Sequence, residues 1–139
     1  MISRYKYWFF SIFSFIIFVF CQLISWLIYR SNLLVFKNEK IVFFFTPPYL
    51  LFLMSLAIAA FIIFSIIELK KNQNNSIIFS LALILGSGLS NFADRILKGG
   101  VADYLDLIFW KMNLADILIF IGIFLFFFNL LNKRRENPN

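Results

Sequence analysis

The sequence predicts an all-α membrane protein, a single domain over residues 1–139 with four transmembrane helices. Its residues are 62% hydrophobic and only 14% charged, whereas a soluble domain is about half apolar and about a quarter charged. A globule of this size cannot bury so much apolar surface, so lipid must accept it. The apolar residues are concentrated in four runs, and short basic clusters beside those runs carry the net charge of +6.

The first predicted helix is the apolar run Tyr7–Tyr29, which follows a basic start. At about 1.5 Å of rise per residue, this run is long enough to cross a bilayer. A basic start before an apolar run is also typical of a secretory signal, and Cys21 could mark a lipoprotein cleavage site. The residue before it is Phe20, however, where such a site needs a small residue. We therefore expect a retained span.

The remaining helices are bounded by prolines, glycines and polar turns. The second run, Tyr49–Ile67, follows two prolines, which are tolerated at a helix start because their missing N–H groups cost little there. The third run extends from Ser76 to about Phe92, and small residues near its end would let a neighbouring helix approach closely. The fourth run is Leu114–Leu131, followed by a basic tail.

Both termini are expected on the cytoplasmic face, because an even number of spans returns the chain to its starting side. The basic tail and the Lys70-Lys71 turn then share that face, where they contact membrane lipids. The aromatic residues lie inside the apolar runs rather than beside a basic stripe, so nucleic-acid binding is not expected. A monomer is expected, since four helices can enclose a polar site.

The counts of histidine and cysteine limit the catalytic mechanisms and metal sites that are possible. The chain has no histidine and one cysteine, Cys21. Catalysis by Ser-His or Cys-His pairs and His-ligated metal sites are thereby excluded, and an internal disulfide cannot form. No metal or cofactor is expected. Cys21 is interpreted as a packing residue, because no base is expected near it.

Acidic residues are few and unevenly distributed. Four of the seven fall in the stretch that joins the third and fourth predicted helices: Asp94, Asp103, Asp106 and Asp116. Asp94 and Asp116 lie at the margins of apolar helices, where a carboxylate is costly and is usually functional or paired. This stretch is therefore the candidate functional region.

Amide side chains accompany these acids at helical spacing. Asn91, Asp94 and Arg95 are spaced i, i+3, i+4 and share one face of a helix. Asn113 and Asp116 are spaced i, i+3 at the start of the fourth helix. There the helix dipole favours an acid, and Asn113 can act as the N-cap. Two polar helix ends are thus predicted to face each other across a short acidic connection.

An aspartyl pair is the simplest catalytic device for a chain without histidine. Two carboxyl groups held close together cannot both ionise easily, so one retains a proton. One can then activate water while the protonated one polarises a peptide carbonyl. Taken singly, each acid also has an ordinary explanation. Asp94 can pair with Arg95 or a basic loop residue, Asp116 can be a helix-start acid, and Asp103 can be a solvated loop acid.

Three blocks around these acids resemble the signal peptidase II family, membrane aspartic proteases that process lipoproteins. The blocks are residues 86–95 (Gly-x-Gly-Leu-Ser-Asn-x-x-Asp-Arg), 100–106 (Gly-Val-Ala-Asp-Tyr-Leu-Asp) and 113–116 (Asn-Leu-Ala-Asp). They occur in the family's order, and with four spans the resemblance covers most of the chain. A looser match at residues 37–43 resembles the family's Asn-x-Gly-x-Ala-Phe block between the first two helices.

The resemblance implies a role for each matched residue. Asp103 and Asp116 are implied to be the catalytic pair, and Asn38 is implied to contact the bound peptide. The residues implied to orient the pair and the substrate backbone are Asn91, Asp94, Arg95 and Asn113. The implied substrate is a diacylglyceryl-modified prolipoprotein, cut before its lipidated cysteine at the extracytoplasmic face of a bacterial inner membrane.

The family's fold further implies a small β-rich cradle from about Asn32 to Thr46, and a lid between the two aspartates on the same face. This chain departs from the family pattern in three places. Lys40 replaces the glycine of the first-loop block, and the short stretch between Asp106 and Asn113 predicts a truncated lid. At residues 21–25, the family's Asp-Gln-x-x-Lys is Cys-Gln-Leu-Ile-Ser, so both charged positions are lost.

Three other functions are compatible with parts of the sequence. A divergent relative could bind lipidated peptides without cutting them. A small channel or transporter could line an ion path with the acids, although its acids would be expected near the middle of the spans. A Ser-Lys protease could use Ser87 or Ser90 but needs a buried lysine, and we expect Lys98 in a loop and Lys111 exposed.

Overall fold

The computed structural model describes residues 3–30, 42–71, 74–107 and 110–136. Within these residues the apolar runs form four helices: α1 (Ser3–Arg30), α2 (Pro48–Lys71), α3 (Asn75–Lys98) and α4 (Leu114–Glu136). All four are long and apolar enough to cross a membrane, judged by length and composition. A helix satisfies its backbone N–H and C=O groups internally, as a segment surrounded by lipid must.

The helix that differs most from its predicted bounds is α3. Asn74 caps its start by accepting a hydrogen bond from the backbone N–H of Ser76 at 2.8 Å. The helix then continues past Phe92 to Lys98 and ends at Gly99, whose φ of 78° lies in the left-handed region that favours glycine. The expectation that Lys98 lies in a loop is therefore wrong. Its ammonium pairs with an acid one turn earlier, which favours continuation of the helix.

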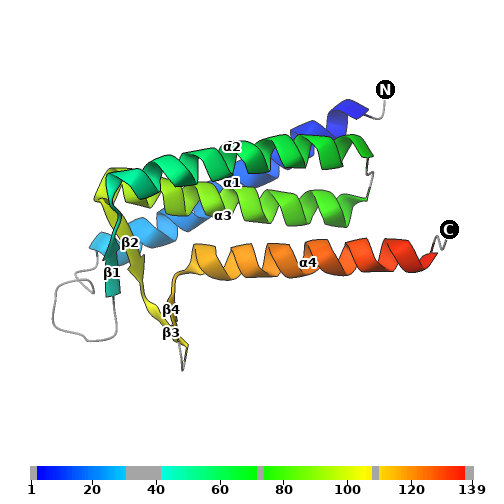
Figure 1. The fold of residues 1–139 in the computed structure, drawn as a ribbon. Helices are drawn as coiled ribbons and strands as arrows, with labels where there is room; N and C mark the ends of the chain where they lie inside the picture. The colour runs from blue at the N-terminus through cyan, green and yellow to red at the C-terminus, as the bar shows by residue number, and fades with distance from the viewer. Residues whose placement is uncertain (1–2, 31–41, 72–73, 108–109, 137–139) are drawn as a thin grey trace.

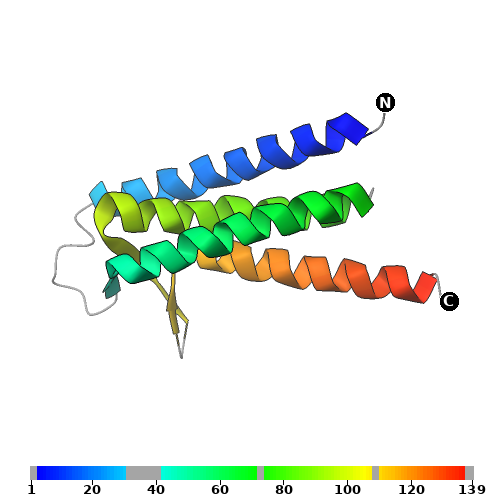
Figure 2. The same ribbon diagram turned by 45° about the horizontal axis from the view of Figure 1, so that its top comes forward.

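Helix α3 forms the centre of the bundle, with its most extensive contacts to α4 and α1 (Figures 1 and 2). Two glycines allow these contacts to be close. A Cβ at Gly86 would lie 2.5 Å from the backbone oxygen of Ser14 in α1, so α1 and α3 touch there. At the contact between α3 and α4, a Cβ at Gly122 of α4 would lie 3.0 Å from the backbone oxygen of Ser80 in α3. The predicted close approach of a helix to the small residues of α3 is confirmed at Gly86.

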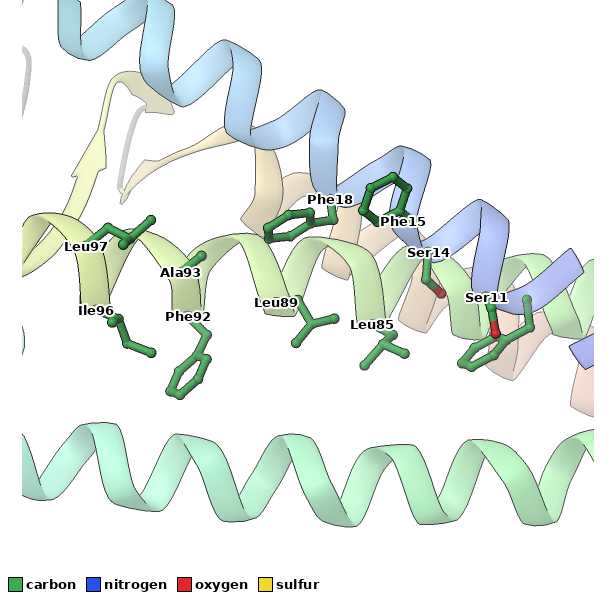
Figure 3. Close-up of a pocket in the computed structure, with 11 residues that line it drawn as sticks. Ser11, Ser14, Phe15, Phe18, Leu85, Leu89, Phe92, Ala93, Ile96 and Leu97 are labelled. Carbon is green, nitrogen blue, oxygen red and sulfur yellow. The ribbon is translucent and has the colours of Figure 1, made fainter. Parts of the chain in front are cut away.

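The other three helices present large apolar side chains outward. Examples are Trp8 and Phe15 on α1, Phe52 and Ile63 on α2, and Phe124 and Phe128 on α4. An apolar groove of about 610 Å³ runs along α1 and α3 and is lined by side chains of both helices. Figure 3 shows Leu85, Leu89, Phe92 and Ile96 along α3, pointing from α3 toward α2. Such surfaces are stable against lipid rather than water.

In the described part of the chain, four short strands lie at one end of the helices: β1 (Val42–Phe45), β2 (Gly100–Asp103), β3 (Leu105–Leu107) and β4 (Trp110–Met112). β1 and β2 pair antiparallel with Val42 opposite Asp103, and β3 pairs antiparallel with β4. The start of α1 and the end of α4 lie together at the opposite end of the molecule (Figure 1). The fold is thus mostly helical, and its small sheets are confined to the end where the candidate acids lie.

Candidate active site

The first turn of α4 is organised by two residues that hold each other. The backbone N–H of Asp116 donates to the Asn113 side-chain oxygen at 3.0 Å, and the backbone N–H of Asn113 donates to Asp116 Oδ2 at 3.3 Å. This reciprocal arrangement is a capping box, which satisfies donors that a helix start leaves unpaired. A third donor, the backbone N–H of Leu114, bonds to the phenol oxygen of Tyr104 at 3.1 Å. The predicted N-cap role of Asn113 is confirmed.

Asp103 reaches this turn because the chain reverses after α3. The left-handed turn at Gly99 directs β2 back along the bundle end, where β1 pairs with it. The backbone N–H of Thr46 also donates to the carbonyl of Gly99 at 2.9 Å, which ties the turn to the end of β1. Asp103, the last residue of β2, accepts a hydrogen bond from Asn113 Nδ2 at 3.1 Å. Asn113 therefore contacts both candidate aspartates.

The end of α3 approaches the same turn from the other side. Asn91 Nδ2 donates to Asp116 Oδ1 at 2.6 Å. One turn later, Arg95 Nη1 donates to the backbone carbonyl of Asn91 at 3.0 Å. The guanidinium charge of Arg95 interacts with both Asp116 and Asp103. We refer to Asp103 and Asp116 together as the carboxyl pair.

Burial changes the acidity of the carboxyl pair. Asp103 is 9% exposed, and this loss of solvent raises its pKa above the ordinary value. The nearby negative charge of Asp116 raises the pKa of Asp103 further, while the hydrogen bond from Asn113 and the charge of Arg95 act in the opposite direction. The net effect is a raised pKa of Asp103, which shifts this carboxyl group toward its protonated form. A protonated and an ionised carboxyl group side by side can act as acid and base.

Asp94 belongs to a separate group of contacts. It is 4% exposed and lies on the side of α3 that faces α1. Its oxygens accept hydrogen bonds from Gln22 Nε2 at 3.0 Å, from Lys98 Nζ at 2.8 Å and from the hydroxyl of Ser25. Lys98 Nζ also donates to Ser25 Oγ at 2.8 Å. We refer to Gln22, Ser25, Asp94 and Lys98 as the Asp94 cluster.

The structure thus brings most of the predicted site residues to one end of the bundle. Four of them are joined by hydrogen bonds: Asn91, Asp103, Asn113 and Asp116. Arg95 lies beside them, whereas Asp94 contacts α1 instead. Asn38 lies outside the described residues.

Sequence reasoning missed four residues at or beside this site: Gln22, Ser25, Lys98 and Tyr104. A signal for Lys98 was present, because Asp94 and Lys98 have the i, i+4 spacing of a helical ion pair. The contacts of Gln22 and Ser25 had no such signal, since α1 is remote in sequence. The ordinary explanation, that Asp94 pairs with a nearby basic residue, is correct in kind, and the partner is Lys98.

The structure also bears on three other kinds of site: a Ser-Lys pair, a cysteine nucleophile and a metal centre. Lys98 is largely buried and lies beside Ser25, but it forms a salt bridge with Asp94, whereas the lysine of a Ser-Lys pair must act as a neutral amine. Ser87 donates its hydroxyl to the carbonyl of Leu83 at 2.7 Å. Cys21 is buried at 3% exposure, in keeping with a packing residue. Among the described residues, no group of three or more His, Cys, Asp or Glu side chains could hold a metal ion.

Comparison with known proteins assigns the chain to a family. A family model described as "Signal peptidase (SPase) II" matches residues 5–132 of the chain. The chain belongs to the signal peptidase II family. The carboxyl pair and the amides around it lie within the matched segment.

Individual relatives agree with this family. The chain is 41% identical over 80 residues to the lipoprotein signal peptidase of Buchnera aphidicola subsp. Schizaphis graminum, over 54% of this chain and 51% of that protein. It is 34% identical over 114 residues to the enzyme of Janthinobacterium sp. (strain Marseille), over 73% of this chain and 67% of that protein. The chain therefore spans about half the length of the first of these signal peptidases and about two thirds of the second.

A solved structure shares the fold. A bacterial membrane enzyme superposes with a TM-score of 0.69 over 94% of this chain and 91% of that one, at 20% sequence identity. Four apolar helices and membership of a bacterial signal peptidase II family together indicate a multi-pass protein of a bacterial inner membrane. The channel or transporter alternative is not favoured, because the family is one of peptidases and the acids cluster at one end of the helices.

Proposed function

We propose that this chain is an aspartic endopeptidase that removes signal peptides from diacylglyceryl-modified prolipoproteins by cutting before the lipidated cysteine. The observation that carries the proposal is the carboxyl pair, Asp103 and Asp116, held through one amide, Asn113, at the end of an apolar bundle. Membership of the signal peptidase II family supports the substrate class. A site at the end of membrane-spanning helices suits a lipidated substrate, whose acyl chains can stay in hydrocarbon while water reaches the pair.

The proposed reaction is acid–base hydrolysis without a metal or a covalent intermediate. Asp116 takes a proton from a water molecule whose oxygen attacks the peptide carbonyl carbon, and Asp103 donates its proton to the carbonyl oxygen. In the breakdown of the tetrahedral intermediate, Asp116 gives its proton to the leaving nitrogen, Asp103 takes a proton from a hydroxyl of the intermediate, and the carbon–nitrogen bond breaks, so both carboxyl groups return to their starting states. The raised pKa of the buried Asp103 supports its assignment as the acid. The two oxygens of Asp116, oriented by Asn91 and Asn113, support its assignment as the base.

The supporting residues have distinct proposed roles. Asn91 and Asn113 orient the carboxyl groups, and Arg95 offsets negative charge that develops as the pair exchanges its proton. Asn38, beyond the described residues, is proposed to bind the peptide backbone of the substrate. Asp94 acts through α3 rather than by contact with the pair.

The strands supply the proposed substrate-binding elements. The β1–β2 sheet, with residues 32–46, is proposed to form the cradle on the membrane surface. The β3–β4 hairpin, which lies between Asp103 and Asp116 in sequence, is proposed to form the short lid. We propose that this end faces the extracytoplasmic side, that both termini are cytoplasmic and that the protein works as a monomer in contact with membrane lipids. The Lys70 and Lys71 side chains at the opposite end support this orientation.

The test is cleavage of a diacylglyceryl-modified prolipoprotein by the purified full chain in detergent. Asp103→Asn and Asp116→Asn each replace one carboxyl group by an amide of nearly the same size. We expect cleavage to fall about 10³-fold or more in both variants. Glu68→Gln is the matched control, an identical chemical change in α2 at the far end of the bundle, and it should cleave like the wild type. Cleavage that survives either aspartate change would exclude this site. A wild type that binds the lipidated peptide but never cuts it would identify the chain as an inactive relative.

A further inference from the structure

Three carboxylates and two cations meet at the end of α3. Asp94 and the carboxyl pair supply the negative charges, and Arg95 and Lys98 supply the positive ones. The charge of Arg95 interacts with Asp116, with Asp103 and also with Asp94, its neighbour in sequence. Arg95 Nη1 bonds to the carbonyl of Asn91, whereas Lys98 is the cation in contact with Asp94.

Lys98 is held against Asp94 from several sides. Its ammonium lies 2.8 Å from Asp94 Oδ1 and 2.8 Å from Ser25 Oγ, and 5.6 Å from the centre of the Tyr29 ring. The Lys98 side chain is 16% exposed and that of Asp94 is 5% exposed. Removal of water strengthens such an interaction well beyond that of a surface ion pair. Asp94 and Lys98 thus form a largely buried ion pair.

The Asp94 cluster also joins two helices. Gln22 of α1 donates to Asp94 and to both the carbonyl and the hydroxyl oxygen of Ser90 in α3, at 3.0, 2.9 and 3.1 Å. Ser25, one turn further along α1, donates to Asp94 as well. These bonds anchor the last turns of α3 to α1. The same turns carry Asn91, which bonds to Asp116, and Arg95.

We propose that Lys98 is a positioning residue for the carboxyl pair: by pairing with Asp94 across the α1–α3 contact, it fixes the last turns of α3, which carry Asn91 and Arg95. This inference rests on the proposed function. Without the Lys98 ammonium, Asp94 keeps only its neutral donors, so these turns are held less firmly against α1, and Asn91 and Arg95 shift relative to the pair. The chemical step then slows, while the surface that binds the substrate is unchanged.

The geometry makes a specific exchange possible. Because Lys98 Nζ reaches Ser25 Oγ, the ammonium can in principle be supplied from either helix. Residues 21–25 of this chain lack the lysine with which the related family pattern ends, and the ammonium from α3 lies beside that position. A lysine at position 25 combined with a serine at position 98 should restore the same charge beside Asp94. The two side chains then exchange helices but keep their contact.

The experiment measures kcat and KM for prolipoprotein cleavage by the full chain in detergent, with thermal unfolding as a check on folding. Lys98→Met should lower kcat on the order of 10²-fold, as expected for a displaced charge near the reacting groups, with KM within about 2-fold of the wild type. Lys98→Arg, and the double variant Ser25→Lys with Lys98→Ser, should each recover most of kcat. Lys71→Met, which removes an exposed lysine at the other end of the bundle, is the control.

The possible results distinguish a failure of the Lys98 inference from a failure of the proposed function. A folded Lys98→Met protein with the kcat of the wild type overturns the inference and leaves the proposed function standing. So does a folded double variant that is as slow as Lys98→Met, because the charge would then be present without effect. A fall in kcat matched by an equal rise in KM in Lys98→Met also overturns it, since the defect would then lie in binding. A wild type that does not cleave the substrate overturns the proposed function and this inference with it.

Discussion

The two acidic centres at the strand end of the bundle are built differently. In the Asp94 cluster, a lysine lies 2.8 Å from the carboxylate and two donors from α1 complete its hydrogen bonds. In the carboxyl pair, the oxygens are held by the neutral amides of Asn91 and Asn113, and the Arg95 guanidinium bonds to a backbone carbonyl instead. One acid is thus matched by a cation in contact, whereas the other two are oriented by uncharged groups.

This difference shows how the end of one helix can both stabilise the packing of the bundle and orient groups that take part in a reaction. A buried carboxylate with a cation in contact has its charge compensated, so it can contribute to helix packing. A carboxyl pair held by amides is oriented without being neutralised, so one proton can be shared between its members. The proposed function requires this second arrangement.

The largest effect is expected when one member of each centre is made neutral. Asp116→Asn should reduce kcat about 10³-fold or more, because an amide cannot take a proton from water. Asp94→Asn should retain much more activity than Asp116→Asn, because Asp94 does not contact the carboxyl pair. Rates for both variants under saturating prolipoprotein provide the measurement. Equal losses of kcat in the two variants would show that the Asp94 cluster and the carboxyl pair do not differ in their importance for cleavage.

The next effect concerns the free energy of unfolding. Lys98→Met leaves Asp94 buried without its cation, which should destabilise the protein by about 3 kcal/mol. Lys71 is 67% exposed and lies 3.9 Å from Glu68, so Lys71→Met should change stability by less than about 1 kcal/mol. Equilibrium unfolding in detergent would compare the two. If both substitutions cost the same, the Asp94–Lys98 pair behaves as an ordinary surface ion pair.

A smaller effect is expected from the helix contact that carries the Asp94 cluster. A methyl group at Gly86 would meet the backbone oxygen of Ser14 at 2.5 Å, so Gly86→Ala forces α1 and α3 apart and should cost about 1–3 kcal/mol. At Gly88 nothing lies within 4 Å of such a methyl group, and Gly88→Ala should be neutral or stabilise the helix by up to about 1 kcal/mol. Thermal unfolding of the two single variants decides the point. A tolerated Gly86→Ala would show that the contact can be loosened freely.

The smallest effect is a shift in the pH dependence of cleavage. The charged and polar groups that face Asp103 are Asp116 and Asn113 from α4 and Arg95 from α3. Asn113→Ser keeps a good helix cap but removes the amide that bonds to the Asp103 carboxylate. Because that bond lowers the pKa of Asp103, its loss should raise the pKa further.

The sign of the pH shift follows from the role proposed for Asp103. A general acid is active while it holds its proton, so a higher pKa of Asp103 extends activity to higher pH. The alkaline fall of kcat in Asn113→Ser should therefore move to higher pH than in the wild type. A pH–rate profile measures this. If instead the acidic rise of kcat moves to higher pH and the alkaline fall stays in place, Asp103 is the base and Asp116 is the acid.

Much of the fold was predictable because it depends on local sequence. Long apolar runs form helices in lipid wherever they occur, so the four spans follow from composition and run length. The i, i+3 spacing of Asn113 and Asp116 at a helix start likewise predicts that Asn113 is the N-cap, which the structure confirms. The grouping of the four aspartates between the third and fourth helices is visible in the sequence itself. These features need no knowledge of which helices touch.

The tertiary structure decided which neighbours each acid has. Gln22 and Ser25 lie about seventy residues from Asp94 in the chain, and nothing local in α1 predicts that they meet it. Their contact depends on the close approach of α1 to α3 at Gly86, which sets the rotation of one helix against the other. Local sequence therefore specifies the spans, the position of the acids at one end and the cap of α4. Packing determined that Lys98 pairs with Asp94 while Asn91 and Asn113 hold the carboxyl pair, because contacts between distant segments depend on how whole helices fit together.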